Sequence, residues 1–401
     1  MTASVAAHIA VINGGSSSIK FGIYRSGDVL ERTLAGTVHL AGRHGATLTF
    51  TQPAIPSENA SVEIPAATSA AAFLADWMSS RPAFSLVKMI GHRVVHGMQH
   101  SDPALVTPVL LQELRGIRPF DPEHLPLEIE LIEAFHHRHP ALPQLACFDT
   151  AFHRGMPRVA KLLPLPRRFE QQGVQRYGFH GLSYTWLVQE LARLGDPAAS
   201  RGRVILAHLG NGASMAAVRD GASIDTSMGF TPGSGLPMGT RSGDVDPGLP
   251  DFMARTEGMT AAQFNHMANH DSGLLGVSQS SPDIRDLLAV EARDARAAEA
   301  VALFCYQAKK LVGAYAAALG GLDTLVFSGG IGENAAVIRE RICAGLEFLG
   351  ISLDTQRNAA NAAVISTDDA RATVRVIRTD EELVIARACA TQLLMNKGNE
   401  S

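Results

Sequence analysis

Residues 8–24 are HIAVINGGSSSIKFGIY, and they indicate how the fold begins. The run His8–Ile12 is apolar, the next residues up to Ser18 are mostly Gly and Ser, and apolar side chains then alternate with others as far as Tyr24. An apolar run, a polar turn and an alternation of period two are typical of two antiparallel strands joined by a tight turn. The stretch therefore predicts a β-hairpin.

The same design returns about half the chain later, which suggests an internal duplication. Val204–Leu206 leads into the turn His208–Ser214, and Met215–Val218 follows as a second apolar run. A third Gly-rich segment, predicted to be a loop at 328–334, comes directly after the predicted strand Thr324–Phe327. Such turns present backbone N–H groups that a phosphate can approach closely. The chain contains neither GxxxxGK(S/T) nor GxGxxG, which argues against P-loop kinases and Rossmann dehydrogenases.

The rest of the pattern mixes strands and helices, which is typical of α/β layers. Apolar spacing predicts a helix over Leu125–His137 and a long buried helix over Ala297–Leu319. Strands are predicted at Val87–Ile90 and at Leu145–Phe148, directly before Asp149. Residues 51–70, rich in Pro, Ala and Ser, are expected to form a surface excursion.

Composition narrows the class of protein. A chain of 401 residues with 46% hydrophobic and 18% charged residues is expected to fold into two or three domains. A net charge of −4 gives no basic footprint for nucleic acid. The longest apolar stretch, Val301–Leu319, contains Gln307, Lys309 and Lys310, so no membrane span is expected. Four cysteines without CxxC spacing favour reduced thiols in the cytoplasm.

Three polar groups admit two interpretations each. Arg241, set among Gly, Ser and Asp, suits a bidentate contact with a phosphoryl group or carboxylate, or equally a surface turn with an Arg–Asp pair. His180, flanked by Gly and aromatic residues, is either a donor to developing charge or a structural histidine. The histidines at 136, 137 and 139 fit a solvated helix end better than a zinc site. Glu381 and Glu382 are candidates for the hard cation Mg²⁺.

Taken together, nine segments resemble the acetate kinase family, in the order that the family shows. They are residues 13–20, 91–97, 148–153, 176–181, 208–214, 225–232, 238–247, 329–334 and 378–383. The resemblance implies an α/β fold: a duplicated ribonuclease-H-like, actin-type ATPase fold with an interdomain cleft. It implies one domain at residues 1–150 plus 385–401, and a second at 151–384.

The resemblance also implies a role for each matching residue. Asn13 and Glu381 would bind Mg²⁺, with Mn²⁺ as an alternative, and Asp149, His180 and Arg241 would be catalytic. The pocket for the carboxylic acid would consist of Arg93, Val95, Phe120, Phe179 and Pro232. ATP or ADP would contact Lys20, His208, Leu209, Gly210, Asn211, Gly212, Asp283, Ile284, Arg285, Gly330, Ile331, Gly332, Glu333 and Asn334.

The implied activity is reversible, in-line transfer of the γ-phosphoryl group of ATP to acetate, giving acetyl phosphate and ADP. The acid is already ionised at pH 7, so positive charge is needed more than a strong base. Asp149 would therefore either move a proton or only orient charge. A bulky Phe120 favours acetate; the alternatives are a propionate or butyrate kinase and, from another class, an actin- or Hsp70-like nucleotide switch. The resemblance further implies a homodimer.

This chain departs from the family pattern at three places. Pro119-Phe120-Asp121 stands where many relatives have Pro-Leu-His, and Tyr184 stands where a His is usual. The loop at 233–237 lacks the usual Leu-Glu. These departures leave the residues with implied catalytic roles in place and change their surroundings.

Overall fold

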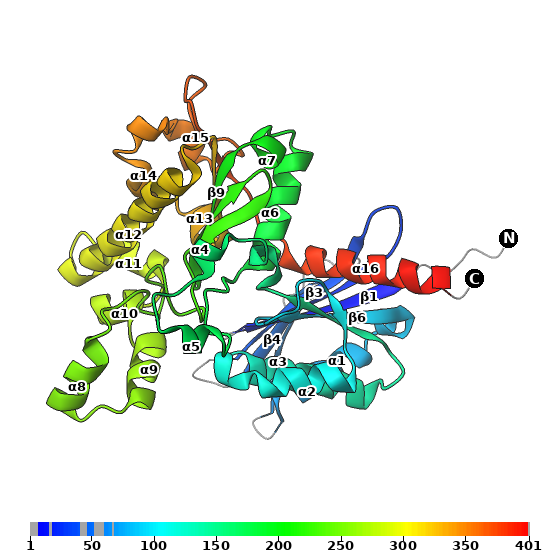
Figure 1. Ribbon diagram of the computed structural model, residues 1–401. Coiled ribbons are helices and arrows are strands. Elements are labelled where there is room, and N and C mark those ends of the chain that lie inside the picture. The colour runs from blue at the N-terminus through cyan, green and yellow to red at the C-terminus, as the bar shows by residue number, and fades with distance from the viewer. Residues whose placement is uncertain (1–6, 16–17, 41–45, 52–59, 66–67, 400–401) are drawn as a thin grey trace. The chain divides into compact units, whose positions relative to one another are not determined.

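The computed structural model describes residues 7–15, 18–40, 46–51, 60–65 and 68–399 (Figure 1). The chain divides into unit 1, which is Met1–Ala151 with Asp380–Ser401, and unit 2, which is Phe152–Thr379. Ser16 and Ser17 of the predicted turn, and much of the predicted excursion at 51–70, lie outside the described residues.

Unit 1 contains a mixed sheet with the order β5-β4-β3-β2-β1-β6-β8-β7. Its strands are β1 (His8–Gly14), β2 (Ser18–Arg25), β3 (Glu31–His39), β4 (Thr47–Thr51), β5 (Ala60–Glu63), β6 (Val87–Val94), β7 (Ala104–Leu105) and β8 (Gln144–Phe148). Strands β1 and β2 pair antiparallel, with His8 opposite Arg25 and Asn13 opposite Lys20, which confirms the predicted hairpin. Strands β1, β6 and β8 are parallel, so their carboxyl ends meet at one edge.

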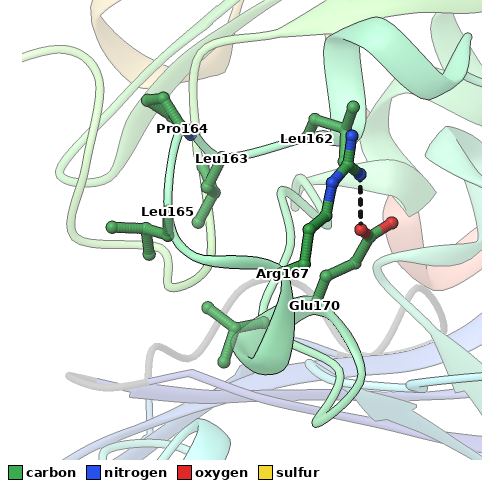
Figure 2. Close-up of a pocket in the computed structure, with 7 residues that line it drawn as sticks. Leu162, Leu163, Pro164, Leu165, Arg167 and Glu170 are labelled. Atoms are coloured by element: carbon green, nitrogen blue, oxygen red, sulfur yellow. Dashed lines mark hydrogen bonds and ion pairs between the residues drawn. The ribbon is translucent and has the colours of Figure 1, made fainter.

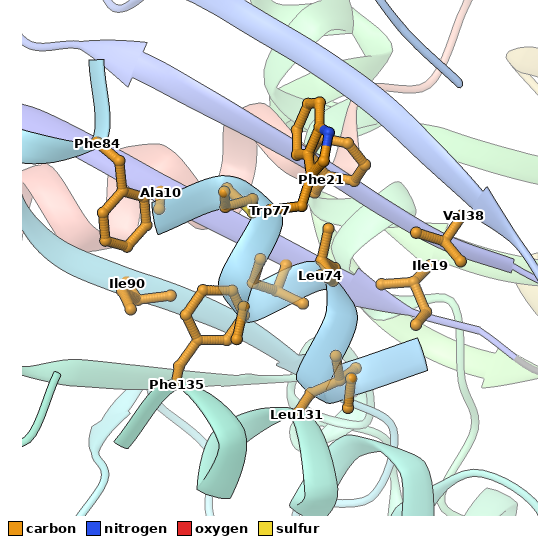
Figure 3. Close-up of a cluster of buried hydrophobic side chains, with 14 of the residues drawn as sticks. Ala10, Ile19, Phe21, Val38, Leu74, Trp77, Phe84, Ile90, Leu131 and Phe135 are labelled. Atoms are coloured by element: carbon orange, nitrogen blue, oxygen red, sulfur yellow. The ribbon is translucent and has the colours of Figure 1, made fainter. Parts of the chain in front are cut away.

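Helices cover both faces of the central strands of this sheet. They are α1 (Ala70–Ser79), α2 (Pro108–Gly116), α3 (Leu125–Arg138) and α16 (Glu381–Asn399), with 3₁₀ turns at η1 (Pro82–Leu86) and η2 (Arg118–Phe120). On one face Phe21 packs edge-on against Trp77, with ring centroids 5.4 Å apart, in a core that also holds Ile90 and Phe135 (Figure 3). On the other face α16 packs over β1 and β6.

Unit 2 contains a sheet with the order β11-β10-β9-β12-β13. Its strands are β9 (Arg203–Leu209), β10 (Ala213–Arg219), β11 (Ala222–Thr226), β12 (Thr324–Ser328) and β13 (Thr373–Val376). Its helices are α4 (Arg158–Lys161), α5 (Arg167–Glu170), α6 (Gly181–Arg193), α7 (Ala198–Arg201), α8 (Leu249–Glu257), α9 (Ala261–His270), α10 (Gly273–Ser278), α11 (Ile284–Val290), α12 (Ala295–Leu319), α13 (Gly329–Asn334), α14 (Ala336–Cys343) and α15 (Thr355–Ala359). Further 3₁₀ turns lie at η3 (Ala151–His153) and η4 (Glu347–Leu349). Figure 1 shows α6 and α12 on opposite sides of β9.

The two sheets share one topology. In unit 1 the order β3-β2-β1-β6-β8 runs through two antiparallel pairings and then two parallel ones. In unit 2 the order β11-β10-β9-β12-β13 runs through the same series of pairings. The repeated hairpin of the sequence is therefore the start of a repeated fold.

The predicted loop at 328–334 is wrong, because most of it is helix α13. Gly329 has φ +75°, and a Cβ there would lie 2.6 Å from the carbonyl oxygen of Leu209, so glycine is required. The fully buried Arg339 donates to the carbonyls of Gly332 and Glu333 and so satisfies the end of the helix. The closing helix α16 also begins at Glu381, before the residue 385 predicted for the closing segment. None of the helices in the described ranges has the length and apolar content needed to cross a bilayer.

Gly91 provides a direct test of how α16 is seated on unit 1. A Cβ at Gly91 would lie 2.4 Å from Cγ2 of Ile385 and 2.7 Å from Sγ of Cys389, so Gly91→Ala forces α16 away from β6. We expect the free energy of unfolding to fall by about 1–3 kcal/mol, measured by urea titration. Gly116→Ala is the control, because its Cβ meets nothing within 4 Å. Equal stability of the two variants would contradict this packing.

Candidate active site

A buried arginine organises the carboxyl edge of the sheet in unit 1. Arg93, near the end of β6, has only 11% of its side chain exposed. Its Nη1 donates to the carbonyl of Gly14 at 2.6 Å, and its Nη2 donates to Oδ2 of Asp149 at 2.8 Å. Asp149 follows β8 directly and is completely buried. The parallel strands thus bring Arg93 and Asp149 together, two residues to which the sequence predicted separate roles.

The sequence analysis missed a second carboxylate beside this arginine. Glu128 is buried on α3, with Oε1 3.8 Å from Nη1 of Arg93 and Oε2 accepting from the backbone N–H of Val95 at 2.9 Å. Burial raises its pKa to about 8, against the lowering effect of Arg93. The available signal was its position: Glu128 lies on the apolar stripe of the helix, three residues after Leu125 and four before Ile132.

The residues predicted to bind metal also lie together in unit 1. The side-chain amide of Asn13 donates to Oε2 of Glu381 at 2.9 Å and to Oε1 of Glu382 at 2.8 Å. Amide and carboxylate oxygens are ligands of the kind that Mg²⁺ prefers, so this set fits that cation. Among the described residues no group of three or more His, Cys, Asp and Glu side chains is arranged to hold a metal ion.

Lys20, which was predicted to contact the nucleotide, is opposite Asn13 in the hairpin and is exposed.

The predicted acid pocket is divided between the two units. Val95 is buried in unit 1, where the half-buried ring of Phe120 lies edge-on to His96, with centroids 5.8 Å apart. Asp121 fixes the turn after Phe120 by accepting from the ring and the backbone N–H of His124 at 2.9 and 3.2 Å. Phe179 and Pro232 are both buried in unit 2.

In unit 2 the two predicted catalytic side chains face one glycine. A Cβ placed on Gly212 would lie 3.4 Å from Nε2 of His180 and 3.8 Å from Nη1 of Arg241. His180 has φ +60°, a left-handed conformation that is uncommon outside glycine, and it immediately precedes α6. Gly212 ends the turn between β9 and β10, so the imidazole and the guanidinium both lie beside this Gly-rich turn.

Serine hydroxyl groups contact the Nδ1 atoms of the two histidines in this site. Nδ1 of His180 is 2.8 Å from Oγ of Ser214, and Nδ1 of His208 is 2.8 Å from Oγ of Ser183. The two imidazole rings lie with centroids 4.3 Å apart. Neither serine was assigned a role from the sequence, although both fall within or next to the segments that carry the family resemblance.

The remaining residues predicted to contact the nucleotide lie in three groups within unit 2. In the turn after β9, Gly210 donates its N–H to the carbonyl of Gly212, and a Cβ on Gly210 would lie 3.8 Å from the backbone N of Gly330. Gly330 and Asn334 in α13 are exposed, whereas Glu333 points inward and accepts from the N–H groups of Gly329 and Thr379 at 3.1 Å. The other members of the set are Leu209 and Ile284, both buried; Asn211, exposed; Ile331, half-buried; Gly332, buried; and Asp283 and Arg285, which pair with each other at 2.6 Å.

A separate pocket of about 260 Å³ lies in unit 2 around the segment 162–174 (Figure 2). Leucine side chains line it, and Arg167 pairs with Glu170 at 2.7 Å beside them. It contains none of the predicted site residues, so we assign it no part in the chemistry.

The repeated sheet topology, together with Gly-rich turns next to charged side chains at the strand ends, defines a duplicated ribonuclease-H-like fold of the actin-type ATPases. A family model for the acetokinase family matches residues 8–387, and the chain belongs to this family. As a member it is a phosphotransferase that acts on a carboxylate and ATP.

Individual relatives agree with this assignment. The chain is 43% identical to an acetate kinase of Rhodopseudomonas palustris over 391 residues, which covers 94% of this chain and 96% of that protein. It is 41% identical to a propionate kinase of Citrobacter rodentium, with 94% and 95% covered. The crystal structure of Porphyromonas gingivalis acetate kinase superposes with a TM-score of 0.85 at 36% identity, covering 97% of this chain and all of that one.

The buried Glu128 predicts a pH dependence of stability. Its pKa is about 8 in the folded protein and near 4.5 when unfolded, so the folded state favours the proton. This contribution is complete below about pH 4.5 and is lost progressively as the pH rises to about 8. Glu128→Gln lacks this titration and keeps an acceptor for Val95. We therefore expect the melting temperature of Glu128→Gln, relative to that of the wild type, to rise as the pH is raised from 5 to 8.

The control for this comparison is Glu130→Gln, an exposed carboxylate on the same helix. Melting curves of Glu128→Gln that run parallel to those of the wild type across this pH range would show that Glu128 is ionised in the folded protein.

Proposed function

We propose that this protein is an acetate kinase, which transfers the γ-phosphoryl group of ATP to acetate and gives acetyl phosphate and ADP. The observation that carries the proposal is that His180 Nε2 and Arg241 Nη1 both lie beside Gly212 in the Gly-rich turn between β9 and β10. A phosphoryl group in transit spreads negative charge over its oxygens, and donors already in position stabilise that charge. An imidazole and a guanidinium that lie beside the same Gly-rich turn suit this task.

In the proposed reaction one carboxylate oxygen of acetate forms a bond to the γ-phosphorus. The bond from that phosphorus to the bridging oxygen breaks, and ADP leaves with the electron pair. No proton has to be removed from the acceptor at neutral pH, so Asp149 is not required as a base. Its contact with Nη2 of Arg93 supports the other role considered for it, which is to hold that arginine for binding the acid.

We propose that Asn13 and Glu381, together with Glu382, hold Mg²⁺. When bound, the cation neutralises charge on the polyphosphate of ATP. The contact of the Asn13 amide with both carboxylates supports this assignment. We further propose that the turn at 208–212 and helix α13 contact the nucleotide, because the backbone N–H of Gly330 lies beside that turn. Units 1 and 2 are proposed to be the two domains of the duplicated fold.

Phe120 supports acetate over longer acids, because its ring is fixed by His96 and by the turn at Asp121. One methylene group is worth only ~1–3 kcal/mol in such a pocket, so propionate is the second candidate. The propionate kinase among the similar proteins favours the same alternative. Four buried cysteines without disulfides support a cytoplasmic location, and the homodimer stays a prediction from the family.

The substrate is tested by incubating the protein with Mg-ATP, hydroxylamine and acetate, propionate or butyrate in turn, and measuring the acyl hydroxamate. We expect the largest kcat/KM with acetate and a fall as the chain lengthens. A maximum with propionate would retain the chemistry and replace the substrate. Absence of hydroxamate with all three acids, alongside measurable ATP binding, would favour the nucleotide-switch alternative.

Arg241→Ala tests the charge that unit 2 contributes. We expect kcat to fall by ~10²–10³, because one donor to the developing charge is lost. Arg255→Ala is the control, since Arg255 pairs with Asp251 on the surface of α8 in the same unit. Turnover near that of the wild type in a folded Arg241→Ala variant would contradict the role proposed for Arg241.

A further inference from the structure

We propose that Tyr184 is a positioning residue that, through Ser214, fixes which ring nitrogen of His180 carries the proton. This inference rests on the proposed function of His180 as a donor. The phenol oxygen of Tyr184 lies 2.5 Å from Oγ of Ser214. The same Oγ lies 2.8 Å from Nδ1 of His180. Three side chains from α6, β10 and the residue preceding α6 thus form one hydrogen-bonded chain.

The phenol and the serine of this chain are held rigidly. Tyr184 and Ser214 are both completely buried. The ring of Tyr184 lies 5.7 Å from that of Phe152 and 5.6 Å from that of His153, and it belongs to the core cluster of unit 2. Phenylalanine would fill the same space, so packing alone does not account for the hydroxyl group.

The order of donors along the chain follows from the single hydrogen that each hydroxyl carries. A phenol is the better donor of the two hydroxyls, since its pKa is near 10 and well below that of an aliphatic alcohol. When Tyr184 donates to Ser214, the hydrogen of Ser214 is left to bond Nδ1 of His180. A neutral imidazole that accepts at Nδ1 carries its proton on Nε2.

The Nε2 atom of His180 is the ring nitrogen that lies toward Gly212, beside the turn where the phosphoryl group is proposed to pass. Tyr184 therefore keeps the donor face of the imidazole toward the reacting group while lying on the opposite side of the ring from it. This gives a role to the tyrosine that stands where the family pattern has histidine, because either side chain supplies a donor in this place.

The test is Tyr184→Phe, which removes the donor and keeps the ring. We expect kcat with acetate and Mg-ATP to fall roughly 10-fold, by analogy with the lower end of the loss seen when the hydrogen-bond partner of a metal-bound histidine is removed. The KM values should change by less than about twofold. Tyr177→Phe is the matched control, since it deletes another buried phenol hydroxyl of unit 2, which donates to the carbonyl of Gly173 at 2.7 Å.

A double-mutant cycle separates positioning from a general effect on the fold. In the His180→Ala background, Tyr184→Phe should cause no further loss of kcat, because its effect passes through the imidazole. A loss of the same size in both backgrounds would overturn the proposal. Tyr184→His, which restores a donor, should recover most of the activity; a loss equal to that of Tyr184→Phe would also count against it.

A readout that does not depend on turnover is the ¹⁵N spectrum of His180, assigned by comparison with His180→Ala. We expect the Nε2–H tautomer in the wild type and a mixture of tautomers in Tyr184→Phe; identical spectra would overturn the proposal. If the wild type itself fails to phosphorylate acetate, the proposed function fails, and this spectrum still decides whether Tyr184 sets the proton.

Discussion

The burial of one positive charge constrains most of the arrangement at the carboxyl edge of unit 1. A guanidinium as buried as that of Arg93 is stable only if its charge is compensated. The carboxylate of Asp149 and the carbonyl of Gly14 provide that compensation, whereas the buried Nε–H has no hydrogen-bond partner among the described residues. These partners follow from β1 and β8 lying on either side of β6. Glu128 adds a carboxyl group from α3 and also fixes the backbone at Val95. The sheet order, the helix above it and the charge therefore depend on one another.

Unit 2 repeats the topology of unit 1, but the side chains at the corresponding edge of its sheet are held by neutral hydroxyl groups and not by carboxylates. His208 lies at the end of β9, Ser214 at the start of β10, and His180 and Ser183 at the start of α6. Ser214 contacts the ring of His180, and Ser183 contacts that of His208. Neutral partners of this kind orient a ring without adding a full charge beside it. Carboxylates set the position of an arginine in one unit, and hydroxyls set the proton of a histidine in the other.

Local sequence patterns were sufficient to predict the hairpin at 8–24, the long helix α12 and the repeated design of the two sheets. The Gly-rich segment 329–334 was mispredicted as a loop because groups outside the segment hold it as a helix. Arg339 donates to the carbonyls of Gly332 and Glu333, and the distant N–H of Thr379 bonds to the side chain of Glu333. The sequence motifs predicted which residues form the candidate site, but they did not predict the hydrogen-bond partners that fix the positions of these residues. The partners of Arg93 and His180 come from other strands and helices, and a single sequence does not record which side chains the fold brings into contact.

The closing helix of unit 1 also governs when that unit can be completed during synthesis. Unit 1 takes its first strands from the start of the chain and α16 from its last residues, with all of unit 2 between them. At a ribosomal rate of about 5–20 residues per second, the delay between these two parts is on the order of 10 to 50 s. During that interval the face of β6 at Gly91 lacks the helix that covers it in the folded protein. Unit 2 is formed by one continuous segment and has no such delay, so unit 2 is able to finish folding before unit 1.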